Sequence, residues 1–154
     1  MSLPTILHSG EGEAVQMGES VCTFKVTGRD THGHAGLFEF TMPPGAGASP
    51  HIHKELTEMF YVTEGKVELL LADKKVNASQ GAFMLVPEST PHGFTNIGNS
   101  QATLLILFCP ADSREGYFKG MAELTKNGRE PTKEELIDLM ERYDQHLVPD
   151  PTDQ

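Results

Sequence analysis

The sequence has few cysteines, few basic residues and no long apolar run, and each of these scarcities excludes a class of protein. Only 2 of its 154 residues are cysteines. Cys22 and Cys109 lie far apart and lack the close spacing of a zinc-binding pair. We therefore expect two buried thiols rather than a disulfide.

Basic residues are also scarce, with 12 Lys and Arg against 22 Asp and Glu and a formal net charge of −10. Nucleic acids and anionic membranes are bound by clustered Lys and Arg, so this charge argues against both partners. The chain has no apolar run of the roughly 18 residues that a membrane-spanning helix needs. Its first residues lack the basic and apolar regions of a signal peptide. We expect a cytoplasmic protein with no nucleic-acid or membrane partner.

Short segments rich in Val, Phe, Leu, Thr and Tyr predict an all-β protein, because Gly, Pro, Asn or Asp separates them. The predicted strands are 20–28, 36–42, 58–63, 66–73, 82–86, 92–97 and 101–108. No helical segment lies between them, which indicates an antiparallel sandwich or barrel over residues 1–112. A chain of 154 residues is long enough for one domain with a full hydrophobic core.

The pattern changes after Pro110, where residues 114–126 and 132–147 show helical periodicity. Thr132 and Glu135 have the spacing of a capping box. We predict a C-terminal extension, residues 113–148, of two amphipathic helices that pack on the barrel or on a neighbouring subunit. Residues 149–154 are expected to form a tail.

Three histidines and one glutamate form the main candidate site. Side chains alternate between the two faces of a strand, so His51 and His53 are expected to point the same way. With Glu58 and His92 they supply three imidazoles and one carboxylate. This set suits one divalent transition ion, either Fe, Mn, Ni, Co, Cu or Zn, and leaves positions open for a substrate or dioxygen.

A second His-x-His pair, His32 and His34, has no carboxylate partner at a matching distance. Gly33 and Gly36 indicate a turn there, so we expect a solvated loop.

The histidine segment and a downstream glycine-proline segment together resemble the two motifs of the cupin superfamily. The first motif is matched by Gly45, His51, His53, Glu58 and Gly65. The second is matched by Gly81, Pro87, His92 and Asn96, while Ser89 stands where the family has a turn glycine. The resemblance covers roughly residues 36–108 and implies a jelly-roll barrel, also called a double-stranded β-helix, with the four side chains as metal ligands. It also implies a homodimer formed by exchange of an N-terminal strand.

Several phenylalanines are predicted to share strand faces with the site. Alternation places Phe60 on the same face as Glu58, and Phe94 on the same face as His92. Phe38 and Phe40 share a face of their own strand, which indicates either barrel core or a wall beside the metal. We predict that the substrate-binding side chains are Phe38, Phe40, Phe60 and Phe94.

The resemblance extends to small single-barrel proteins similar to quercetin dioxygenases, and it implies a metal-dependent dioxygenase acting on a small enolisable or phenolic substrate. Glu58 would then be a metal ligand or the base that takes the substrate's proton. Two alternatives remain open, because one barrel hosts unrelated functions. They are a metal-dependent isomerase, epimerase or lyase of a small sugar or keto acid, and a non-catalytic binding protein.

Overall fold

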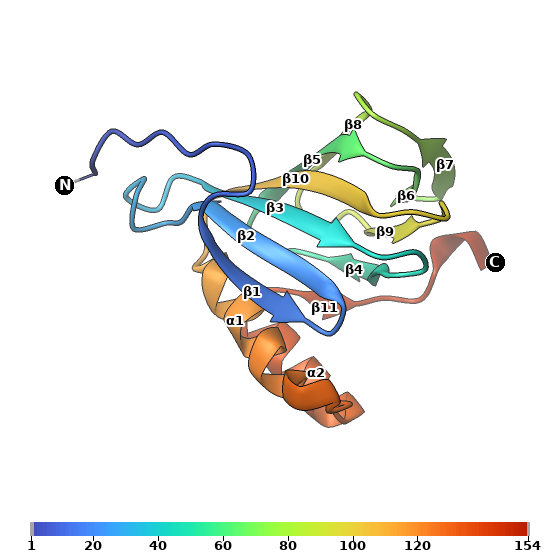
Figure 1. The fold of residues 1–154 in the computed structure, drawn as a ribbon. Coiled ribbons are helices and arrows are strands. Elements are labelled where there is room, and N and C mark those ends of the chain that lie inside the picture. Colours follow the sequence, from blue (N-terminus) through green and yellow to red (C-terminus); the bar gives the residue numbers. More distant parts are fainter. Residues whose placement is uncertain (1, 154) are drawn as a thin grey trace.

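The computed structural model describes residues 2–153 and shows two antiparallel sheets with helices at one end (Figure 1). The first sheet has the order β1-β2-β3-β10-β5-β8. Its strands are β1 (Glu13–Met17), β2 (Ser20–Val26), β3 (Gly36–Met42), β5 (Thr57–Glu64), β8 (Phe83–Val86) and β10 (Ala102–Cys109). The second sheet has the order β11-β4-β9-β6-β7. Its strands are β4 (Gly47–Ile52), β6 (Val67–Leu71), β7 (Lys74–Ala78), β9 (His92–Asn96) and β11 (His146–Leu147).

This arrangement confirms the predicted jelly-roll barrel with two C-terminal helices. The predicted strand 66–73 corresponds to β6, which ends at Leu71 because the backbone turns at Ala72 with a φ of 54°. The chain then returns as β7, a strand that was not predicted. The sequences of β1 and β7 are mostly polar or small, so their composition does not indicate strands. In β3 burial alternates along the whole strand, as predicted.

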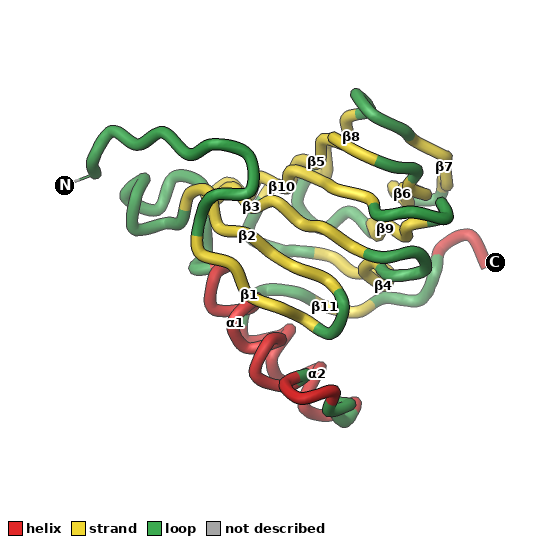
Figure 2. Tube along the Cα trace, in the orientation of Figure 1, coloured by secondary structure: helices red, strands yellow, loops and turns green. Residues whose placement is uncertain are grey.

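The helices are α1 (Arg114–Leu124) and α2 (Lys133–Arg142), and Figure 2 shows them together on one side of the strands. The prediction that the second helix runs to residue 147 is wrong. The backbone at Asp144 has a φ of 54°, a left-handed conformation that a helix cannot continue. The chain then forms β11, which pairs with β4 through His146 and Leu147.

The helices share one hydrophobic core with the barrel. Tyr117 and Phe118 of α1 and Leu139 of α2 belong to the same buried cluster as Phe38 and Phe108. The two helices approach each other closely, since a Cβ on Gly120 would lie 2.5 Å from Cδ1 of Leu139. Figure 1 shows both helices beside β1 and β11, which are edge strands of the two sheets, so the extension covers that side of the barrel.

Both cysteines are free thiols, as expected, with Cys22 buried and Cys109 partly buried. Burial raises the pKa of the Cys22 thiol well above its usual range. Within residues 2–153, the helices are all too short or too polar to cross a membrane.

The capping box predicted for α2 is present and gives a test of how this helix is anchored. The Thr132 hydroxyl accepts from the backbone N–H of Glu135 at 3.2 Å, and the Glu135 carboxylate accepts from the N–H of Thr132 at 2.8 Å. Thr132→Ala should lower the free energy of unfolding by about 1 kcal/mol in denaturant titrations. Thr5→Ala is the control, because that exposed hydroxyl bonds only to a nearby carbonyl. Equal stability of the two variants would contradict the assignment.

Candidate metal centre

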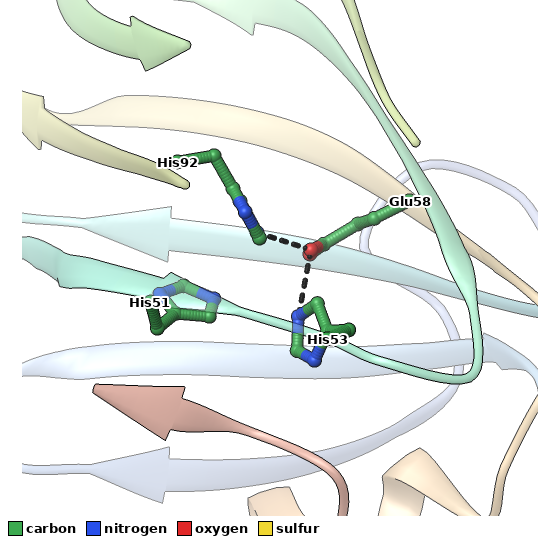
Figure 3. A group of neighbouring side chains, drawn as sticks. All are labelled: His51, His53, Glu58 and His92. Carbon is green, nitrogen blue, oxygen red and sulfur yellow. Dashed lines mark hydrogen bonds and ion pairs between the residues drawn. The ribbon is translucent and has the colours of Figure 1, made fainter. Parts of the chain in front are cut away.

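Four buried side chains meet between the two sheets, and Figure 3 shows how they point toward one another. His51 lies in β4, His53 follows the end of β4, Glu58 lies in β5 and His92 begins β9. One nitrogen of each imidazole and one oxygen of the carboxylate lie within 4.8 Å of one another. The structure thus brings together all four residues that the sequence singles out as ligands.

Strand pairing explains why these residues meet. His51 and His92 are direct partners across the β4–β9 ladder of the second sheet. The chain leaves β4 at Ile52 and crosses to the first sheet, where β5 turns Glu58 inward. Each sheet therefore contributes part of the cluster, and its geometry depends on how the two sheets are packed.

Hydrogen bonds to backbone carbonyls fix the orientation of all three imidazoles. The Nδ1 atoms of His51, His53 and His92 lie 2.7, 2.6 and 3.0 Å from the carbonyl oxygens of Ser49, Asp144 and Thr90, respectively. A carbonyl oxygen only accepts, so each Nδ1 carries the proton. In the neutral ring, Nε2 then presents its lone pair to the centre, which is the form in which histidine binds a metal.

The Glu58 carboxylate is the negative group at the centre of the cluster. Its Oε2 lies 2.7 Å from Nε2 of His92, from which it accepts a hydrogen bond when that ring is doubly protonated, and 2.9 Å from Nε2 of His53. The latter contact is not aligned as a hydrogen bond, so Nε2 of His53 is buried without a hydrogen-bond partner. A bound cation would satisfy this buried nitrogen, which otherwise costs free energy as an unpaired polar atom, so the cluster fits a metal ion.

The electrostatics of the cluster favour an ionised Glu58 and a neutral His51, which are the protonation states that a cation requires. Burial would lower the pKa of His92, but its contact with Glu58 outweighs burial and raises this pKa. Burial alone would raise the pKa of Glu58, but the contacts with His53 and His92 outweigh it and hold this pKa well below its usual range. Burial, with His92 next in size, lowers the pKa of His51 to about 3. An ionised carboxylate and a neutral imidazole are thus present at neutral pH. Three nitrogens and one oxygen fit a single divalent transition ion, and these four residues would hold it.

Ser89, the one departure from the second cupin motif, adopts the backbone that the motif's glycine would provide. Its φ is 59°, in the left-handed region. Its N–H donates to the carbonyl of His53 at 2.6 Å, so the turn also fixes the chain next to a candidate ligand. The serine therefore changes the residue but keeps the turn.

A cavity of about 250 Å³ opens beside the cluster, and His51 and Glu58 form part of its wall. Phe40 and Phe94 also line it, with their ring centroids 5.7 Å apart and nearly perpendicular. Phe38 and Phe60 lie in the buried core instead and are not part of the lining. Strand alternation identified buried faces, but it could not tell which buried rings border the cavity.

Much of the remaining wall comes from the C-terminal extension, which the sequence analysis did not connect with the site. Helix α1 contributes Arg114, Tyr117, Phe118 and Met121, helix α2 contributes Leu136 and Met140, and the following segment contributes Gln145 and Leu147. Their approach to the site depends on how the extension folds back over the barrel. No local motif in the sequence signals that path.

Asp144 joins this extension to the candidate ligands. Its backbone carbonyl accepts from Nδ1 of His53, and its carboxylate accepts from the N–H groups of Lys54 and Glu55 at 2.9 and 2.8 Å. Burial would raise the pKa of Asp144, but these two backbone hydrogen bonds outweigh it and lower the pKa. An ionised Asp144 therefore clamps the segment that carries His53.

Removing this clamp should weaken metal binding. We expect Asp144→Ala to lower the affinity for a divalent ion by about tenfold or more, because partners of this kind hold ligands in position. Competition titration against a chelator measures the change. Asp150→Ala is a matched control, since the Asp150 carboxylate pairs with Lys75 at the surface. An affinity equal to wild type in Asp144→Ala would show that the clamp does not position His53.

Comparisons with known proteins agree with this geometry. Residues 38–108 match the family model Cupin_2, described as a cupin domain. The chain is 36% identical over 95 residues to quercetin 2,3-dioxygenase of Bacillus subtilis. This alignment covers 60% of the present chain and 27% of the dioxygenase. The chain is 33% identical over 87 residues to polyketide synthase CurC of Streptomyces cyaneus, which covers 55% of this chain and 54% of that protein.

These alignments span well under two thirds of the two curated relatives. Among solved structures, the polyketide cyclase RemF from Streptomyces resistomycificus superposes with a TM-score of 0.60 at 23% identity, covering 70% of this chain and 80% of that one. This likeness concerns the fold. The matched sequence, the two facing sheets and the clustered motif side chains agree that residues 38–108 form a cupin domain.

Proposed function

We propose that the protein is a metal-dependent dioxygenase acting on a small enolisable or phenolic substrate. One observation carries the proposal: the three-histidine, one-glutamate cluster forms part of the wall of an otherwise mainly apolar, aromatic-lined cavity. A flat, weakly polar molecule in this cavity would contact the candidate ligands and the phenylalanine rings at the same time. The similarity to quercetin 2,3-dioxygenase supports the same class of reaction.

The chain's own residues would contribute positioning and shielding. Phe40 and Phe94 provide apolar ring surface for a planar substrate, and Leu136 and Met140 of α2 help to keep water out. A bound redox-active ion would supply electron transfer between substrate and dioxygen. Glu58 would hold that ion or take the substrate's hydroxyl proton, and its place in the cavity wall is compatible with both roles.

A non-oxidative reaction on an enolisable substrate is the second candidate, since the same carboxylate beside a cation could move a proton without dioxygen. The similarity to polyketide synthase CurC favours this alternative. Incorporation of deuterium from heavy water into substrate under anaerobic conditions would identify it.

Metal content tests the site itself. Protein purified without a metal-affinity step should contain one transition ion per chain, and His51→Ala combined with His53→Ala should lose it, because half of the donor set is removed. The matched control combines His32→Ala with His34→Ala, the second His-x-His pair, which is exposed in a turn. Elemental analysis gives the result. Equal metal in both double variants would locate the ion elsewhere.

Oxygen uptake tests the reaction. We expect consumption of dioxygen with a flavonol or another enolisable phenol in protein loaded with Fe, Mn, Ni, Co or Cu, but not with Zn. Glu58→Gln should reduce the rate by at least about a hundredfold, because it removes both the charge and the base. An oxygen electrode follows the reaction. An absence of uptake with every metal across a panel of phenols and enediols would refute the dioxygenase proposal.

A further inference from the structure

Arg114 is a buried cation in the wall of the same cavity. It is the first residue of helix α1 and is 2% exposed. By volume it is the largest of the fully buried side chains. The guanidinium carbon lies 4.7 Å from the ring centroid of Phe108 and 4.5 Å from that of Tyr117. Arginine is rarely buried to this degree without an acidic partner.

The hydrogen-bond partners of Arg114 are neutral, and the nearby acidic side chains, Glu58, Asp112 and Asp144, act on it without a direct contact. Its Nη1 donates to the backbone carbonyl of Tyr143 at 2.7 Å, and its Nη2 donates to Oε1 of Gln145 at 2.8 Å. Its Nε has no hydrogen-bond partner. Among residues 2–153, no carboxylate forms an ion pair with it.

Such a group is costly to the folded protein on its own. A buried charge without a counter-ion loses its hydration and is compensated only in part by ring faces and neutral acceptors. Burial accordingly lowers the pKa of Arg114, and Glu58 is the main group that opposes this effect. Glu58, however, already contacts two histidines and belongs to the metal cluster.

The charge balance of the cavity is therefore positive when an ion is bound. A divalent ion with Glu58 leaves one positive charge at the cluster, and Arg114 adds a second at the wall. Most of the other lining side chains are apolar, including Phe40, Phe94 and Ile106, so the field of these charges is weakly screened. A neutral phenol would occupy this space without offsetting the charge of Arg114.

We infer that the substrate is an acid: it carries an ionised carboxylate that pairs with Arg114, in addition to the hydroxyl or enol oxygen that faces the metal cluster. Arg114 is then a specificity-determining residue that touches substrate. The inference rests on the proposed function, which supplies the hydroxyl or enol oxygen that faces the metal cluster. It adds to that function a substrate class, namely aromatic or enolisable carboxylic acids.

A purely structural role for Arg114 is the competing explanation. By holding the carbonyl of Tyr143 and the side chain of Gln145, it fixes both neighbours of Asp144, whose carbonyl orients His53. That role requires hydrogen bonds to the extension, but it makes no distinction between an acid and its amide. The test therefore depends on ligand charge.

The experiment is calorimetric titration of zinc-loaded protein with 6-hydroxy-2-naphthoate and with 6-hydroxy-2-naphthamide. Both probes offer the same hydroxyl to the metal, and zinc removes any contribution from oxygen chemistry. We expect wild type to bind the acid at least about tenfold more tightly than the amide. Arg114→Gln should abolish this preference, whereas Arg114→Lys, which keeps the charge, should retain most of it.

Two further variants keep the test decisive. Arg129→Gln removes a surface arginine that pairs with Glu135 and should leave the preference unchanged. If Arg114→Gln does not fold, Arg114→Met replaces the cation with an apolar side chain of similar length, a change that cores often accept. Equal binding of acid and amide to wild type, or a preference that survives in Arg114→Gln or Arg114→Met, would overturn the inference. The titration measures binding and needs no turnover. Its result would therefore still decide the role of Arg114 if the protein proved not to be a dioxygenase.

Discussion

The contact between the Glu58 carboxylate and the imidazoles of His53 and His92 is the constraint on which the site depends. It joins the two sheets at a point where four polar side chains are buried among apolar ones. Without a cation, a second proton on His92 compensates the carboxylate. With a cation, the same atoms would become its ligands, because the carbonyls on the other side already hold the Nδ1 protons. The barrel core therefore contains a buried carboxylate and imidazole nitrogens that one cation could share.

The C-terminal extension has two roles at this centre. Helices α1 and α2 complete the cavity wall, and the segment after α2 supports His53 through the carbonyl of Asp144. Arg114 connects the two roles, since it lines the cavity and also bonds to Tyr143 and Gln145 on either side of Asp144. The barrel provides the candidate ligands, and the extension provides much of the wall of the cavity beside them.

Local sequence patterns were sufficient to predict the architecture and the membership of the cluster. His51, His53, Glu58 and His92 follow short motifs whose spacing reflects strand alternation and tight turns, so neighbouring residues determine where they point. The contact between His53 and Asp144 joins residues 91 positions apart in the sequence, and the approach of Arg114 depends on how α1 packs on β10. Such contacts follow from the path of the whole chain. Phe38 and Phe60 illustrate the same limit, because alternation gave their face but not their distance from the cavity.

The hydrogen bond from Nδ1 of His53 to the carbonyl of Asp144 has a consequence for how this kind of protein can diversify. The acceptor itself belongs to the backbone, so the left-handed turn at Asp144 is one requirement, and the side-chain carboxylate that holds Lys54 and Glu55 is a second. Changes in the extension are thereby limited by the shape of its backbone at this point as well as by the residue at 144. A related chain that exchanged this extension for another would need to present a new acceptor at the same point before its metal site could be complete.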